Sequence, residues 1–246
     1  DEAIESYDKT LALRPDYSEA WSNRGVALHD LKRYEEALAS YGQAVKITPD
    51  YTEAWSNRGV TLSDLKRYDE ALADYARAQA INPDYAHAHW NESLARLVLG
   101  QYEIGWQKYE YRWQGEVHND PRHTDLPLWL GSESLRGRKI LVWAEQGYGD
   151  AIQFCRYVML LNNLGAEVIL EVPPPLKAIM STMARCLVIA QNEAAPHADF
   201  QCPVLSLPLA FKTNLQSIPS SVPYLSVDDE LMAAWRKRLD LSNTTL

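Results

Sequence analysis

The chain has 246 residues, of which 46% are hydrophobic and 23% charged, a composition typical of a packed protein rather than a disordered one. Its 24 Lys and Arg and 33 Asp and Glu give a formal net charge of −9, which argues against nucleic acid as a partner because the phosphate backbone is itself negative. No apolar run approaches the roughly 20 residues of a membrane helix, and no signal peptide opens the sequence. We therefore expect a cytoplasmic protein without a membrane span.

The first half of the chain is organised by a 34-residue repeat. Residues 18–51 are followed at once by residues 52–85, and Trp21 recurs as Trp55. The period and the residues that recur with it resemble the tetratricopeptide repeat, which is a pair of antiparallel helices. The resemblance implies an all-α solenoid over residues 1–115.

Incomplete repeats flank the two full ones. Residues 1–17 match only the second helix of a repeat, and residues 86–115 match a degenerate third repeat that no proline closes. We therefore expect the chain to begin inside a repeat and to be a fragment of a longer array.

Small and aromatic residues recur where the helices should meet. Gly25 and Gly59 are expected at the close approach of the two helices of a repeat, and Tyr41 and Tyr75 between successive pairs. Arg58 stands where leucine is commoner, a departure that we expect the fold to tolerate.

The pattern changes after a connector at residues 116–137. Residues 138–246 alternate apolar β-rich runs with helical segments, which predicts an α/β domain with a parallel sheet. A helix is expected over residues 151–165, and a last one over 228–239. The expected strands are Lys139–Trp143, Glu167–Val172, Cys186–Ala190 and Asp199–Cys202.

The segments KILVWAEQGYGDAIQFCRYVMLL, AEVILEV and FQCPVLSLPLAF, in this order after the repeats, resemble bacterial tetratricopeptide-repeat proteins fused to a glycosyltransferase-like domain. That domain is related to heptosyltransferases and O-linked N-acetylglucosamine transferases, which have two Rossmann-like lobes (the GT-B type). The resemblance implies that residues 138–246 are the acceptor-side lobe. A nucleotide sugar would bind only through a second lobe, which is missing here, so we expect this chain alone to be inactive.

A glycine-rich turn at residues 147–150 follows the first strand and precedes a helix, at the edge of the sheet where ligands bind. Asp150 has two interpretations. It is the helix N-cap, or it is the general base that deprotonates an acceptor hydroxyl, as the resemblance implies. The expected substrate-binding residues are Glu145, Gln146, Gly147 and Gly149.

Asparagine recurs once in each first helix, as Asn23, Asn57 and Asn91. A side-chain amide both donates and accepts, so each could pair with a bound peptide backbone or bond within its own repeat. O-linked N-acetylglucosamine transferases have asparagines at the matching position, which favours a peptide groove. Acidic residues should share that groove, so the polypeptide partner is expected to be extended, polar and somewhat basic; these residues are Glu19, Glu53, Asp30 and Asp64.

Histidines and cysteines offer little chemistry. His87 and His89 are two residues apart and should point to different faces of a helix, and His118, His123 and His197 are expected in loops as solvated residues. None of the three cysteines has the spacing of a zinc site. We expect neither a metal nor a cofactor in this chain.

Two functions remain open. The first is a protein-interaction solenoid that recruits a polypeptide or glycan acceptor to a sugar-transfer domain. The alternative is a non-catalytic scaffold whose transferase-like lobe only binds.

Overall fold

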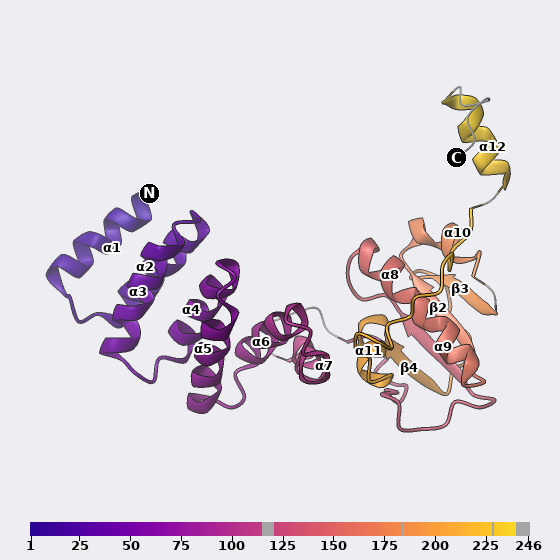
Figure 1. Ribbon diagram of the computed structural model, residues 1–246, viewed down its shortest axis with the longest axis horizontal. Helices are drawn as coiled ribbons and strands as arrows, with labels where there is room; N and C mark the ends of the chain where they lie inside the picture. The colour runs from indigo at the N-terminus through magenta and orange to yellow at the C-terminus, as the bar shows by residue number, and fades with distance from the viewer. Residues whose placement is uncertain (115–120, 184, 228, 240–246) are drawn as a thin grey trace. The chain divides into compact units, whose positions relative to one another are not determined.

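The computed structural model describes residues 1–114, 121–183, 185–227 and 229–239. The chain forms two compact units, Asp1–Pro121 and Arg122–Leu246, whose elements are drawn in Figure 1. His118 and part of the expected connector lie outside the described residues. Within the described ranges, no helix combines the length and the apolar character needed to cross a membrane.

Over its described residues the first unit contains helices and turns but no strand, and each helix packs against the next along the chain. A short 3₁₀ segment, η1 (Glu110–Trp113), follows the last of them. The α-helices are α1 (Glu2–Leu13), α2 (Ser18–Asp30), α3 (Tyr34–Ile47), α4 (Thr52–Asp64), α5 (Tyr68–Ile81), α6 (Ala86–Val98) and α7 (Tyr102–Tyr109). The pairs α2/α3, α4/α5 and α6/α7 are the three repeats, so the expected solenoid-like region of helical pairs is confirmed.

Proline and tryptophan shape the link between successive repeats. Helix α3 ends at Ile47, two residues before Pro49, because proline cannot continue a helix. The indole Nε1–H of Trp55, in the first turn of α4, donates to the Pro49 carbonyl at 3.0 Å. Trp21 makes the same bond to Pro15 at 2.9 Å, so each first helix is tied to the turn before it.

The two helices of a full repeat meet where a tyrosine ring lies on a glycine. A Cβ added to Gly25 would lie 2.7 Å from the ring of Tyr41, and one added to Gly59 would lie 2.6 Å from that of Tyr75. Both tyrosines are almost fully buried. The glycine prediction is confirmed. Each ring also reaches the following pair, since Tyr75 shares a buried cluster with Ala95 of α6 and Tyr41 bonds to Thr61 of α4.

The second unit contains a four-stranded sheet in which every pairing is parallel. The strand order is β3-β2-β1-β4, so β1 lies in the centre beside both β2 and β4. Strands β1 and β2 are buried on both faces after their first residue, as is usual for parallel sheets. The strands are β1 (Lys139–Trp143), β2 (Glu167–Val172), β3 (Cys186–Ala190) and β4 (Phe200–Pro203).

The helices of this unit are shorter than the sequence suggests. The single helix expected over residues 151–165 begins earlier and is divided by a 3₁₀ turn; the chain then reverses at Gly165, whose φ of +81° suits glycine. The helical segments are α8 (Tyr148–Phe154), η2 (Cys155–Tyr157), α9 (Val158–Asn163), η3 (Pro174–Leu176), α10 (Lys177–Met180), η4 (Val204–Ser206), α11 (Leu207–Ala210) and α12 (Asp229–Arg238).

Adding a methyl group at Gly59 should destabilise the first unit. The Cβ would overlap the buried ring of Tyr75, so we expect Gly59→Ala to lower the free energy of unfolding by about 1–3 kcal/mol. Gly42 in α3 is the matched control because a Cβ there meets no atom within 4 Å. Gly42→Ala should raise the stability by about 0.5–1 kcal/mol through helix propensity. Urea denaturation measures both, and equal effects would contradict the close-contact account.

Candidate functional site

The first helix of each repeat carries a stripe of exposed residues. On α4 the stripe contains Glu53, Asn57, Val60 and Asp64, spaced four, three and four residues apart, so all four lie on one side of the helix. All are exposed or half-buried, whereas the opposite side of α4 is buried. The same spacing gives matching stripes on α2 and α6. We call these twelve residues the first-helix face: Glu19, Asn23, Val26, Asp30, Glu53, Asn57, Val60, Asp64, His87, Asn91, Leu94 and Val98.

The three stripes lie side by side. Helix α4 contacts both α2 and α6, its counterparts in the neighbouring repeats. An atomic contact links two of the helices directly, since His29 Nε2 on α2 lies 2.8 Å from Asp64 Oδ2 on α4. Asp64 is therefore partly engaged by an imidazole, while the side chain of Asp30 is 74% exposed.

The asparagines form a row in the sense that they occupy the same position on three neighbouring first helices. In the part of the chain that the structure describes, the side-chain amides of Asn23, Asn57 and Asn91 have no hydrogen-bond partner. Their donors and acceptors are thus available to another molecule. The neighbouring Ser22 and Ser56 are 2% and 1% exposed and cannot reach a ligand.

The glycine-rich turn of the second unit joins β1 to α8, as the sequence indicates. Gly147 is the N-cap of α8, and Asp150 lies three residues into the helix. The Asp150 carboxylate accepts a hydrogen bond from the Gly147 N–H at 3.2 Å, as the third helical residue does in a capping box. The prediction that Asp150 is the N-cap residue is wrong, because the two preceding residues are already helical.

The other predicted substrate-binding residues lie close to Asp150 because they precede it directly in the chain. Gly147 and Gly149 are exposed, and Glu145 and Gln146 are half-buried. A Cβ on Gly149 would meet no atom within 4 Å, so the backbone there is open. The structure brings these four residues together at the carboxyl end of β1.

A charged cluster at the same edge of the sheet was missed from the sequence. Glu171, on β2, is 2% exposed, and its carboxylate accepts from the Arg122 guanidinium. Arg122 also donates to the Ala144 carbonyl at 2.7 Å, directly after β1. Gln191 donates to the same carbonyl at 3.2 Å. Together these bonds hold the start of the glycine-rich turn.

His123 belongs to this cluster rather than to solvent. Its Nε2 lies 3.1 Å from Glu171 Oε2, and its ring meets the edge of Trp143 at 5.9 Å. The prediction of a solvated loop histidine is therefore wrong for His123. The one signal in the sequence was Glu171 itself, a lone charge inside an apolar strand, which requires a partner.

Comparison with known proteins agrees with the helical pairs. Models of the tetratricopeptide repeat match residues 6–39 and 52–85, and a TPR repeat model matches residues 27–66. The chain contains tetratricopeptide repeats. Arrays of this repeat are protein-interaction modules, and the first unit is such a module.

Individual relatives match the chain only in part. Protein FlbA of Caulobacter vibrioides is 29% identical over 72 residues, which are 29% of this chain and 12% of FlbA. The crystal structure of MamA is 23% identical with a TM-score of 0.42, covering 46% of this chain and 66% of that one. The first TPR of Spaghetti (RPAP3), bound to the HSP90 peptide SRMEEVD, is 24% identical with a TM-score of 0.38, covering 39% and 77%.

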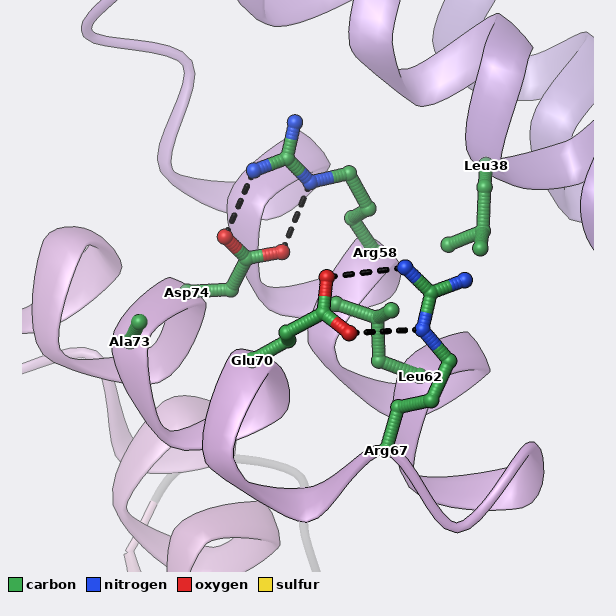
Figure 2. A pocket seen from close by; sticks show the side chains of 7 residues that line it. All are labelled: Leu38, Arg58, Leu62, Arg67, Glu70, Ala73 and Asp74. Atoms are coloured by element: carbon green, nitrogen blue, oxygen red, sulfur yellow. Dashed lines mark hydrogen bonds and ion pairs between the residues drawn. The ribbon is translucent and has the colours of Figure 1, made fainter.

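A cavity of about 410 Å³ lies between the first two tetratricopeptide repeats, and its lining residues are not those of the first-helix face. Figure 2 shows two guanidinium groups among its lining residues, each bonded directly to a carboxylate. Arg58 donates to buried Asp74 through Nε and Nη2 at 2.7 and 2.6 Å. Arg67 makes the same bidentate pair of hydrogen bonds to Glu70. Because each cation faces a carboxylate, the charges of this wall are balanced internally.

The unusual arginine of the repeat is thus explained by its partner. In the first repeat the counterpart, Arg24, bonds Asp8 of α1 and Ser40, each at 2.7 Å. In the third repeat the charges are reversed, and Lys108 Nζ lies 2.8 Å from the carboxylate of buried Glu92. Each repeat therefore has an ion pair at this level, although in the first repeat the carboxylate comes from Asp8 of the preceding helix α1.

The third repeat extends that pair into a network around a histidine. His89 stands where the other repeats have tryptophan, and its Nε2 lies 2.8 Å from the Pro83 carbonyl. Its Nδ1 lies 2.9 Å from Lys108 Nζ, and its ring stacks on Tyr111 at 4.0 Å. A carbonyl only accepts and an ammonium only donates, so this geometry requires neutral His89 with its proton on Nε2.

The buried network holds its members in defined protonation states. Burial, helped by the charge of Lys108, lowers the pKa of His89. Burial opposes ionisation of Glu92, but hydrogen bonds from Lys108, Gln79 and Arg96 outweigh it and keep the pKa of Glu92 below its usual value.

His89 should make the stability of the first unit fall in mild acid. Its pKa is lowered in the folded state, so the unfolded chain binds the proton first as the pH drops. The contribution of neutral His89 to the free energy of unfolding is complete above about pH 6.5, the usual pKa of histidine, and is lost as the pH falls towards the lowered pKa of the folded state. His89→Trp, which restores the residue of the other repeats, should remove this part of the pH dependence. Urea titrations between pH 5 and 8 measure it, and parallel curves for both proteins would contradict the account.

Proposed function

We propose that the repeat unit binds an extended polypeptide on the first-helix face, with the side-chain amides of Asn23, Asn57 and Asn91 pairing with the backbone of the bound segment. The observation that carries this proposal is the row of three amides, each on an exposed stripe and without a hydrogen-bond partner in the described chain. A peptide backbone offers alternating donors and acceptors whatever its sequence, and an amide side chain complements both.

Four acidic residues flank the amide row and set the charge of the partner. They leave this part of the face negative, so the bound segment carries basic side chains. These proposed groove residues are Glu19, Glu53, Asp30 and Asp64.

For the second unit we propose a Rossmann-like lobe that holds the acceptor in a nucleotide-sugar-dependent glycosyltransferase of the two-lobed type. The strand order and the open glycine-rich turn at the carboxyl end of the central strand support this proposal, because ligands of parallel sheets bind at that edge. Glu145, Gln146, Gly147 and Gly149 would contact the acceptor, and Asp150 would take the proton of its hydroxyl. The nucleotide sugar would bind on another lobe.

A second candidate function, a binding scaffold without chemistry, is favoured by one observation. The Asp150 carboxylate already accepts from the Gly147 N–H, which gives it a capping role independent of catalysis. Both candidates keep the repeat unit as the part that recruits a polypeptide.

Removing two amides should weaken peptide binding without unfolding the repeats. Asn23→Ala combined with Asn57→Ala deletes amides that make no internal hydrogen bond in the described chain, so we expect a loss of about 1–2 kcal/mol of binding free energy and a nearly unchanged melting temperature. A basic peptide library titrated against both proteins measures the difference; wild-type affinity should be about 10–100 μM, since the partner must be ordered. Equal binding, or a large drop in melting temperature, would show that the asparagines are structural.

The role of Asp150 can be tested in a protein that joins this unit to a nucleotide-sugar-binding lobe. Asp150→Asn keeps an oxygen to accept the Gly147 N–H but cannot take a proton, so sugar transfer should fall by about 10²-fold or more with little change in stability. The present chain alone should transfer no sugar. An unchanged rate in the variant would leave Asp150 with its capping role only and would favour the scaffold.

A further inference from the structure

We propose that the first-helix face is divided into an acidic part on α2 and α4 and an apolar part on α6. It selects polypeptides that carry basic residues followed or preceded by one large apolar residue. This inference rests on the proposed function of the same face. It adds a specificity that the amide row cannot supply, because a peptide backbone is the same in every sequence.

The acidic part is defined by exposed carboxylates. None of the twelve residues of the face is Lys or Arg, and the first two stripes both begin and end with a carboxylate. The Asp30 side chain is 74% exposed and that of Asp64 is 44% exposed, with His29 as neighbour. Basic side chains of a bound segment would meet carboxylates on both sides of the amide row.

The apolar part begins where the third repeat departs from the other two. Val98 stands in the place of Asp30 and Asp64, and Leu94 in the place of Val26 and Val60. Val98 is 66% exposed and Leu94 is 41% exposed, four residues apart on the same side of α6. His87 likewise replaces the first carboxylate, so the third stripe carries no acid.

Helix packing does not require these two apolar side chains. Helices α6 and α7 meet through other residues, among them Leu97, which lies over Gly105 so closely that a Cβ there would be 2.7 Å from it. The buried side of α6 is formed by other residues, among them Ala88 and Ala95. Leu94 and Val98 thus remain for a ligand, whose apolar side chain would cover them.

The spacing of the ligand follows from the spacing of the helices. Packed helices lie about 8–10 Å apart, and an extended chain advances about 3.3 Å per residue. One repeat therefore corresponds to about three residues of the bound segment. Two basic residues three positions apart would lie over α2 and α4, and an apolar residue three positions further would lie over α6.

The test compares two peptides that both carry lysines at positions 2 and 5. One has leucine at position 8 and the other has lysine there. Each is also made with the reversed sequence, because side-chain amides can pair with a peptide backbone that runs in either direction. Of the two leucine peptides, the one whose direction fits the face should bind the wild-type protein about tenfold more tightly than the lysine peptide of the same direction, as expected for burying most of one leucine side chain. Val98→Asp gives the third stripe the carboxylate of the other two and should reverse this preference. Leu13→Asp, an 85% exposed leucine of α1 outside the face, is the matched control and should leave the preference unchanged.

The outcomes separate this inference from the proposed function. Binding of both peptides with a preference that Val98→Asp does not alter would overturn the divided face and leave the amide row intact. A reversal by Leu13→Asp as well would also overturn it. Failure of every peptide to bind would overturn both proposals. Weaker binding of both peptides to the Asn23→Ala, Asn57→Ala double variant, together with the reversal by Val98→Asp, is the result that supports both.

Discussion

The close approach of the two helices of a repeat, with a tyrosine ring lying on a glycine, determines where the other residues of the first unit can lie. Because Tyr41 covers Gly25 and Tyr75 covers Gly59, the side of α2 and of α4 that carries the glycine is occupied. The opposite side must then face outwards. Because this steric constraint recurs after 34 residues, residues 34 positions apart occupy equivalent places on neighbouring helices. Asparagine, carboxylate and apolar side chains therefore lie in rows across the repeats.

The third repeat shows that this constraint can be met in a different way. Ser93 replaces the glycine of the first helix, and the close contact moves to Gly105 under Leu97. The buried charge pair changes sign to Glu92 and Lys108, and His89 takes over the hydrogen bond of tryptophan. In the interior of the repeat, a substitution in one helix is matched by a substitution in its partner, so the contacts are kept. The outside is free of that requirement, and there the carboxylates give way to Leu94 and Val98.

Much of this fold could be predicted from local patterns, and the rest depends on contacts between distant residues. Strand Glu167–Val172 was predicted to the residue because an apolar run ends there at proline. The interaction of Glu171 with Arg122 could not be found in this way, since 49 residues separate them. Asp150 was misplaced by three positions because the start of α8 depends on its bond to the Gly147 N–H. Likewise the partner of Arg58 is known only once Asp74 faces it across the helix pair.

The most direct test of the account follows the side-chain amide resonances of Asn23, Asn57 and Asn91 by NMR while an extended basic peptide is added. If the amide row binds the peptide backbone, all three pairs of signals should shift together and give one Kd. The side-chain amides of Asn162 and Asn214, in the second unit, should stay unchanged. Peptide binding that leaves the three asparagine signals in place, or that shifts only the backbone signals of residues 145–150, would contradict the account.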